Sequence, residues 1–242
     1  MNLYGQTDTG CVRPNNQDAY RVGELSQEAC FAVVCDGMGG AAGGSVASTL
    51  AADTIEQRLR SGYRDEMNES SLLHLLETAV SAANALVYDE AMADVDLRGM
   101  GTTVVVAIVR GDQAYTAHVG DSRIYLITDT LEQLTRDHSI VQEMVEKGQL
   151  TPEEAKYHPR KHLITRAVGV DSRVSCDLQV TDLPSGAQLL LCSDGLTNML
   201  DQDELLPILK DADDAASIPE RLIESAKQAG GHDNITAVVM IP

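Results

Sequence analysis

CFAVVCDGMGG, at residues 30–40, is the stretch around which the chain is organised. Its apolar half, residues 30–35, predicts a buried strand, and the glycines that follow predict a turn. Asp36 therefore stands where the strand leaves the core, beside glycines that let the backbone approach a ligand closely. An ordinary strand-to-helix turn with one acidic residue explains the pattern equally well, so this stretch alone does not decide between a turn and a ligand site.

Helical and strand patterns follow one another in blocks along the rest of the chain. Apolar residues recur at helical spacing over residues 45–62 and again from about residue 71 to residue 87. Residues 101–108 are nearly continuous threonine and valine, which predicts a strand covered on both faces. Further strands are predicted at residues 2–8, 19–24, 113–119, 123–127, 178–183, 188–193 and 235–241.

The order of these elements predicts the fold class. The two long helices arrive as a consecutive pair between runs of strands, which favours an α+β fold over a doubly wound parallel sheet. Short turns between successive strands favour antiparallel pairing. Because strands buried on both faces need two covering layers, we expect a sandwich of two antiparallel sheets with helices packed outside. No linker or repeat interrupts residues 1–242, so we expect one domain.

Residues 137–169 interrupt the series of strands with mixed, charged sequence. Ser139 and Thr151 are each followed three residues later by Gln or Glu, a capping-box spacing that predicts short helices at about 139–147 and 152–157. This segment is predicted to be a surface insertion. Such segments often cover a site, although a purely decorative loop is an equally good interpretation.

Composition limits the classes of partner and compartment. The formal net charge is −19, with 18 Lys and Arg against 37 Asp and Glu, which repels nucleic acid and anionic membranes. The five cysteines lack CxxC spacing and lie mostly within apolar runs, as free buried thiols do in a reducing compartment. No signal peptide and no apolar run of about 18 residues are visible, so we expect a cytoplasmic protein.

Aspartates recur at the ends of the predicted strands. Asp36 and Asp194 each follow an apolar strand, and Asp233 immediately precedes the last one. If that last strand runs antiparallel to the other two, these three carboxylates emerge at one edge of the sheet. Asp18 and Asp121 begin strand-like segments and are candidates for the same edge.

Carboxylates without a Cys/His cluster suit hard ions that prefer oxygen ligands, namely Mg²⁺ or Mn²⁺. Two such ions about 3.5–4 Å apart can share a bridging carboxylate and activate a water for in-line attack at phosphorus. Arg13, near Asp18 in the sequence, is suited to hold a phosphate by bidentate hydrogen bonds. Because aspartate also marks ordinary turns, a set of unrelated turns is the alternative.

Six segments resemble, in order, the motifs of the PPM, or type 2C, family of metal-dependent Ser/Thr protein phosphatases in its compact bacterial form. They are residues 13–18, 36–40, 101–103, 120–123, 193–197 and 233–236. The resemblance extends over residues 7–239 and implies a four-layer α-β-β-α sandwich, which agrees with the layers expected from the strand pattern. It also implies hydrolysis of phosphoserine and phosphothreonine in proteins, without a phosphoenzyme intermediate.

The resemblance further implies a centre with two Mn²⁺ or Mg²⁺ ions. Asp36 is expected to bridge the two ions, with the carbonyl of Gly37 on the second ion. Asp194 and Asp233 are expected to bind the first ion. Asp18 is expected to hold the second ion through water, and a bridging water or hydroxide is expected to be the nucleophile.

The remaining expectations concern the phosphoryl group, a third metal ion, the flap and the partners. Arg13 is expected to bind the phosphoryl group, and Asp121 resembles the ligand of a third, weaker metal ion in bacterial members. Residues 137–169 correspond to the variable flap beside the site. The expected partners are phosphorylated proteins that a Ser/Thr kinase supplies, with no nucleic acid and no membrane, and the expected state is a monomer.

Three departures from the family pattern stand out, one of which is that Ala41 and Ser45 replace a His and a Glu frequent in bacterial relatives. Many members have His where this chain has Met38, and that His is assigned as the general acid that protonates the leaving alcohol. Methionine cannot donate a proton. Asn198 stands where some members carry a further aspartate, which leaves the coordination of a third ion open. Among the histidines, we interpret His138 as structural, whereas His158 and His162, in the flap, are candidates to approach a substrate.

Two other functions compete with catalysis. A catalytically inactive member that serves as a binding module would lack metal ligands, but every aspartate expected from the family is present. A calcium-binding regulatory domain is disfavoured because the DxDxDG loop spacing is absent.

Overall fold

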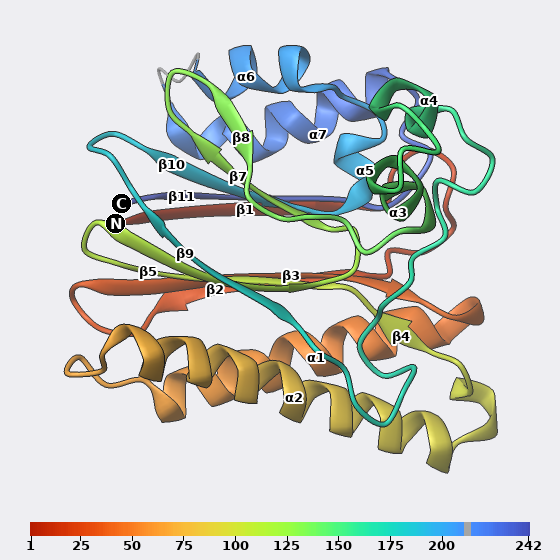
Figure 1. The fold of residues 1–242 in the computed structure, drawn as a ribbon, viewed down its shortest axis with the longest axis horizontal. Coiled ribbons are helices and arrows are strands. Elements are labelled where there is room, and N and C mark those ends of the chain that lie inside the picture. Colours follow the sequence, from red (N-terminus) through yellow and green to blue (C-terminus); the bar gives the residue numbers. More distant parts are fainter. Residues whose placement is uncertain (211–213) are drawn as a thin grey trace.

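The computed structural model describes residues 1–210 and 214–242, which form four stacked layers (Figure 1). Two β-sheets face each other in the middle, and helices cover both outer faces. The predicted α-β-β-α sandwich is therefore confirmed. None of the helices in these described residues is both long and apolar enough to cross a membrane.

The strands of each sheet come from distant parts of the chain. The first sheet contains β1 (Asn2–Asp8), β11 (Ile235–Ile241), β10 (Gln188–Cys192), β7 (Arg123–Ile127) and β8 (Leu131–Gln133), in that spatial order. The second contains β2 (Asp18–Glu24), β3 (Ala29–Met38), β5 (Val104–Arg110), β6 (Gln113–Val119) and β9 (Asp177–Asp182), with β4 (Gly101–Thr102) paired to β3. The neighbouring strands pair antiparallel, as the short turns predicted.

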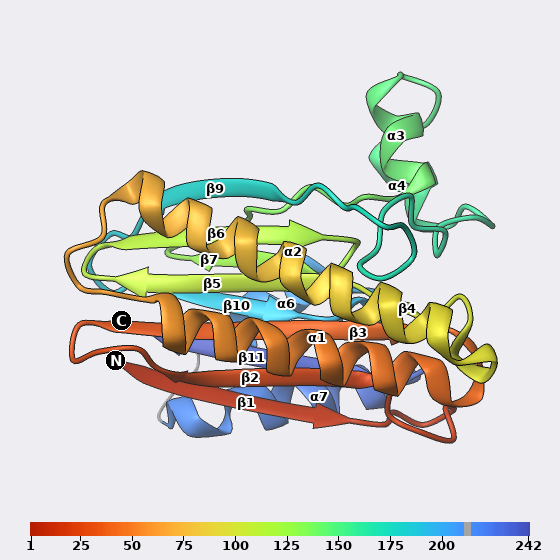
Figure 2. The same cartoon turned by 90° about the horizontal axis from the view of Figure 1, so that it is seen from below.

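The helices divide between the two outer faces. The second sheet is covered by α1 (Gly40–Gly62) and α2 (Glu69–Ala93), followed by the short 3₁₀ helix η1 (Val95–Leu97). The first sheet is covered by α5 (Asp194–Thr197), α6 (Gln202–Lys210), η2 (Ala215–Ser217) and α7 (Ile218–Gln228). Figure 2 shows α3 (Ile140–Glu146) and α4 (Pro152–Lys156) projecting away from the sandwich.

Alternate side chains of the central strands enter different apolar layers. In β3, Phe31 and Val33 pack against the layer of α1 and α2, whereas Ala32 and Val34 pack between the two sheets. All four are completely buried. A strand buried on both faces has no polar side to alternate with, which is why its sequence is a continuous apolar run. Each fully buried valine or phenylalanine stabilises the fold by about 1.5–3 kcal/mol.

The predicted end of this strand is wrong, because β3 continues past Cys35 to Met38. Its last residues pair with β4, with Gly37 opposite Thr102. The backbone N–H of Asp36 donates to Thr103 Oγ1 (3.0 Å), and Thr103 N–H donates to the carbonyl of Asp36 (2.9 Å). Asp36 is therefore fixed within paired backbone and does not lie on a free turn. The turn itself lies at Gly39, whose φ of +119° favours glycine.

The segment at residues 137–169, called the flap below, contains the two predicted helices. Ser139 caps α3 by accepting the N–H of Gln142 (3.2 Å), and Thr151 with Glu154 forms a reciprocal capping box at α4. Both helix starts are therefore confirmed. The flap returns to the sandwich through an antiparallel bridge between Thr102 and Val168. Figure 1 shows β4, α5 and the flap helices at the same end of the sandwich.

Candidate active site

The five predicted aspartates converge, but not at the edge of a single sheet. Asp18 and Asp36 face each other as paired residues of β2 and β3 in the second sheet. Asp194 follows β10, and Asp233 precedes β11, both strands of the first sheet. The expectation of one shared sheet edge is therefore wrong. The carboxylates gather where the ends of two facing sheets meet, because strands of both sheets end there.

Burial, and then the mutual repulsion of the carboxylates, raises their pKa values. Burial, together with the charges of Asp194 and Asp233, raises the pKa of Asp18 to about 7. Burial and the charge of Asp194 raise the pKa of Asp121 to about 8. The pKa of Asp36 is raised well above its usual range by burial and then by the other four carboxylates. Buried negative charges at this density are stabilised by a bound cation.

Two carboxylate oxygens in this cluster are buried without a hydrogen-bond partner in the described part of the chain, Oδ1 of Asp18 and Oδ1 of Asp194. The other oxygen of each group is held firmly. Oδ2 of Asp18 accepts from Ser193 Oγ and from Thr236 Oγ1, both at 2.7 Å. Oδ2 of Asp194 accepts from Asn198 Nδ2 at 2.9 Å. Buried polar atoms nearly always have partners, so these two oxygens fit a divalent ion with oxygen ligands.

Arg13 reaches this cluster from the loop between β1 and β2. Its Nη2 donates to Oδ2 of Asp233 at 2.8 Å, and Oδ1 of Asp233 accepts the N–H of Asn234 at 2.9 Å. The side chain of Arg13 is half exposed. A guanidinium carries five N–H donors, so one contact with Asp233 leaves donors that can bind a phosphoryl oxygen.

Asn234 holds the loop that carries Arg13, a role that the sequence did not predict. Its Nδ2 donates to the carbonyls of Thr9 and Asn15, both at 2.9 Å, and its Oδ1 accepts the N–H of Gln17 at 2.8 Å. Asn234 is almost completely buried. One side-chain amide therefore fixes the loop on both sides of Arg13. Its place directly after Asp233 in a family motif was the only available signal.

Gly195 is pressed against the backbone next to Asp233. A methyl group there would collide with the carbonyl oxygen of Asn234. We expect Gly195→Ala to lower the free energy of unfolding by about 1–3 kcal/mol, because rigid backbone must move to make room. Urea unfolding measures this. Gly62→Ala is the control, since a methyl group there meets only the flexible end of Leu75. Equal losses in both variants would contradict the prediction.

Two cavities lie near the flap, and one of them reaches the carboxylates. The larger, of about 820 Å³, reaches Asp121 and Asp194 and lies between the flap helices and the residues of α5 and α6. The smaller, of about 250 Å³, lies beside Met38 and is lined by the returning end of the flap. The larger cavity therefore gives access to two of the predicted aspartates.

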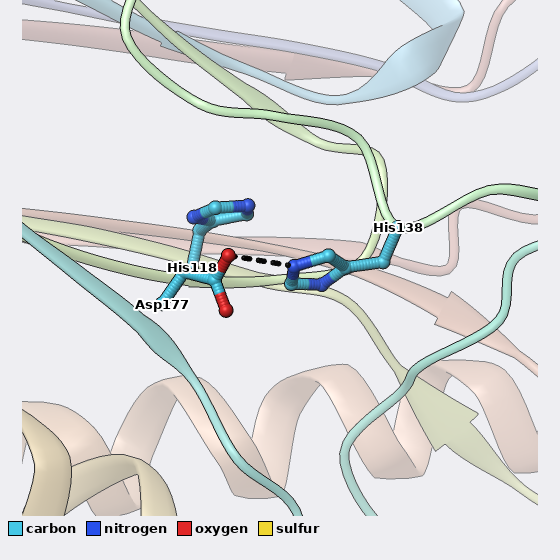
Figure 3. Close-up of side chains that lie close together, drawn as sticks. All are labelled: His118, His138 and Asp177. Carbon is cyan, nitrogen blue, oxygen red and sulfur yellow. Dashed lines mark ion pairs between the residues drawn. The ribbon is translucent and has the colours of Figure 1, made fainter. Parts of the chain in front are cut away.

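A second cluster, formed by His118, His138 and Asp177, has candidate ligand atoms within 4.8 Å of one another (Figure 3). Nδ1 of His138 accepts the N–H of Gly120 at 3.0 Å, so its proton belongs on Nε2, which faces Asp177 Oδ2 at 3.4 Å. Nε2 of His118 lies 2.9 Å from the carbonyl of Arg136, which places its proton there. A metal at His138 Nε2 would have to displace that proton. Nε2 of His138 makes no hydrogen bond within residues 1–210 and 214–242, so the two rings are held by Gly120 and by the carbonyl of Arg136, and we interpret this cluster as structural.

Comparison with known proteins agrees with the fold and the motifs. Residues 13–233 match the family model described as protein phosphatase 2C. The serine/threonine phosphatase stp of Listeria welshimeri is 39% identical over 245 residues, which cover 99% of this chain and 95% of that protein. The solved structure of the S. agalactiae serine/threonine phosphatase has a TM-score of 0.93 at 35% identity and covers 100% of this chain and 99% of that chain.

A further solved structure contains metal. It is the catalytic domain of the serine threonine protein phosphatase PstP in complex with 2 manganese ions, with a TM-score of 0.84 at 36% identity, covering 98% of this chain and 96% of that chain. The chain belongs to the protein phosphatase 2C family. It is a serine/threonine protein phosphatase of the compact bacterial PPM type.

Proposed function

We propose that the chain hydrolyses phosphoserine and phosphothreonine in proteins at a centre of two divalent ions, Mn²⁺ or Mg²⁺, without a phosphoenzyme intermediate. The observation that carries this proposal is the pair of unpartnered buried oxygens on Asp18 and Asp194 within a cluster of five carboxylates. A relative of this fold binds two manganese ions. The donor set here consists of oxygen atoms, which suits the same class of ion.

The ligands that we assign are Asp36 as the shared ligand, Asp194 and Asp233 on one ion, Asp18 and the carbonyl of Gly37 on the other, and Asp121 on a third. When bound, the ions supply an activated water and neutralise charge on the phosphoryl group. The carboxylate of Asp36, at the end where the two sheets meet, is the catalytic group that would hold both ions. Ser193 and Thr236 orient Asp18 through its Oδ2 and leave Oδ1 free for binding.

Arg13 is the catalytic residue that we assign to the phosphoryl group of the substrate. Its loop is anchored by Asn234, so the guanidinium is held beside the carboxylates before the substrate arrives. The contact with Asp233 keeps it there. A guanidinium binds phosphate by two parallel hydrogen bonds, which orients the phosphorus for attack along one line.

A metal titration tests this function. Protein treated with a chelator and then dialysed is expected to be inactive on a phosphothreonine peptide and on p-nitrophenyl phosphate. Activity should return with Mn²⁺ or Mg²⁺ but not with Ca²⁺, because calcium tolerates more ligands and longer bonds. Binding of Mn²⁺ without turnover of any phosphopeptide would instead favour the inactive binding module. Full activity of the chelated protein would exclude the metal mechanism.

Met38 provides a separate prediction about the leaving group. Met38→His is expected to accelerate hydrolysis of alkyl phosphates about 10-fold or more relative to aryl phosphates, because alkoxides are poor leaving groups that need a proton. Rates with phosphoserine peptide and p-nitrophenyl phosphate measure the ratio. Met38→Leu is the control and should leave the ratio unchanged. Equal acceleration of both substrates would show that leaving-group protonation is handled elsewhere.

We further infer that residues 1–242 act as one phosphatase domain with its flap at residues 137–169, as a monomer in the cytoplasm. The high negative charge favours protein partners over nucleic acid and membranes. The substrates would be proteins phosphorylated by a Ser/Thr kinase, as part of signalling. Light scattering at working concentration tests the monomer, and fractionation of cells tests the compartment.

A further inference from the structure

The start of the flap holds the residues on both sides of Asp121. Gly120 precedes Asp121 and exchanges two hydrogen bonds with His138: its N–H donates to His138 Nδ1 (3.0 Å), and its carbonyl accepts the N–H of His138 (2.8 Å). Arg123, two residues after Asp121, donates to Asp137 from Nη2 (2.7 Å) and from Nε (3.0 Å). Two consecutive flap residues therefore fix the turn that presents one carboxylate.

The turn around Asp121 also contacts Thr103, the residue that holds the backbone of Asp36. Gly120 has a φ of +107°, and a methyl group there would lie 2.6 Å from Thr103 Cγ2. Ser122 Oγ lies 2.7 Å from Thr103 Oγ1, and Thr103 in turn donates its N–H to the carbonyl of Asp36. A shift of the turn therefore moves Asp121 relative to Asp36. The spacing between these two carboxylates depends on how the flap holds Gly120.

The same imidazole faces Asp177, the first residue of β9, which binds the end of the flap. The ring of His138 stacks on that of His118, with centroids 4.5 Å apart, and its Nε2 faces Asp177 Oδ2 at 3.4 Å (Figure 3). Asp177 Oδ1 accepts from Arg166 Nη1 at 2.7 Å, and Arg166 lies near the end of the flap. Both histidines are buried. One ring thus binds the Asp121 turn through Nδ1. Its Nε2 makes no hydrogen bond among the described residues but lies 3.4 Å from Asp177 of β9, which in turn binds Arg166 of the flap.

We propose that His138 is a positioning residue that couples the flap to Asp121. This inference rests on the proposed function, in which Asp121 binds a metal ion. Loss of the bond to Nδ1 frees the turn and weakens metal binding at Asp121. Loss of the contact at Nε2 loosens the end of the flap and leaves the metal site intact. Outer-shell residues of this kind change metal affinity by about 10- to 100-fold.

Two substitutions of His138 separate the two contacts. The amide oxygen of Asn falls near the position of Nδ1, and the amide of Gln falls near the position of Nε2. His138→Asn should keep the bond to Gly120 and bind Mn²⁺ with an affinity within about twofold of the wild type. His138→Gln should lower the affinity for the Mn²⁺ ion bound by Asp121 about 10-fold or more. Titration calorimetry measures these affinities without turnover. His74→Gln, at an exposed position of α2, is the control.

In the flap, hydrogen exchange should rank the two variants in the opposite order from Mn²⁺ affinity: the Asn variant should be the more perturbed there. The amide of Thr165 donates to the carbonyl of His138 at 2.8 Å, so it reports the end of the flap. His138→Asn, which loses the contact with Asp177, should exchange faster there than His138→Gln. A structural role alone would loosen both regions in both variants. This crossed pattern therefore separates positioning from general destabilisation.

A double substitution completes the test. In an Asp121→Asn background, His138→Gln should not change the affinities of the remaining Mn²⁺ ions, because its effect acts through Asp121. A further loss in that background would overturn the inference, and so would equal Mn²⁺ affinities for the Asn and Gln variants. A wild type that binds Mn²⁺ with no step dependent on Asp121 overturns it as well. A wild type that binds no Mn²⁺ overturns the proposed function itself.

Discussion

Replacement of Asp36 by alanine is expected to lower the turnover of a phosphothreonine peptide by about 10³-fold or more, because the ligand shared by both ions is lost. The fold should survive. The backbone bonds of Asp36 to Thr103 do not involve its carboxylate. Burial and four neighbouring carboxylates raise the pKa of Asp36, so its charge is unfavourable without a cation and its removal relieves repulsion.

Steady-state kinetics with Mn²⁺ and thermal unfolding with chelator measure the two halves of this prediction. Asp89→Ala, which removes an exposed carboxylate from α2, is the matched control and should change neither quantity. Asp36→Asn should be as inactive as Asp36→Ala, because a neutral amide has neither the negative charge nor the second ligating oxygen that a carboxylate shared by two cations supplies. Activity of Asp36→Ala within tenfold of the wild type would exclude Asp36 as the shared ligand.

Some features of this fold follow from local sequence alone. The run at residues 30–35 predicted a strand correctly, because a strand covered on both faces must be apolar at every position. Thr151 predicted the start of α4 because its capping partner lies only three residues away. The end of β3 was missed, because it depends on pairing between Gly37 and Thr102, which are distant in the sequence.

In the site, too, some features follow from local sequence and others depend on contacts between distant residues. Each aspartate was found from its position beside a strand and from the family motifs, and the structure gathers all five. The side chains that hold these carboxylates in place were not predicted from the sequence. Ser193 and Thr236 bind the carboxylate of Asp18 across 175 and 218 residues of sequence. Hydroxyl residues occur everywhere in a sequence, and only the folded chain tells which of them meet a distant carboxylate.

His138 illustrates this most clearly. The sequence supported a structural interpretation, and the ring is indeed buried among hydrogen bonds. Its contact with Gly120 places it beside the turn of Asp121, although 18 residues separate the two in the sequence. No spacing rule links a residue at the start of the flap to the end of β6, because β7 and β8 lie between them in the sequence. The link exists because β6 and the first residues of the flap lie side by side.

Removal of divalent ions is expected to make the stability of the protein fall as the pH rises from about 5 to 8. An aspartate carboxyl ordinarily has a pKa of 3.8, but burial and neighbouring carboxylates raise the pKa of Asp18 to about 7 and that of Asp121 to about 8. Between these values the folded chain keeps protons that the unfolded chain releases. The stability is therefore greatest below the unfolded pKa and is lost as the pH rises through the folded pKa.

Urea unfolding of chelated protein at several pH values measures this slope, and we expect a total loss on the order of several kcal/mol, since each pKa unit corresponds to about 1.4 kcal/mol. Asp18→Asn and Asp121→Asn should each reduce the dependence of the free energy of unfolding on pH. Saturating Mn²⁺ should remove or reverse it, because the ion binds only deprotonated carboxylates and so stabilises the fold more at higher pH. A chelated protein whose stability is constant or rises between pH 5 and 8 would show that these carboxylates are not buried together in the folded chain.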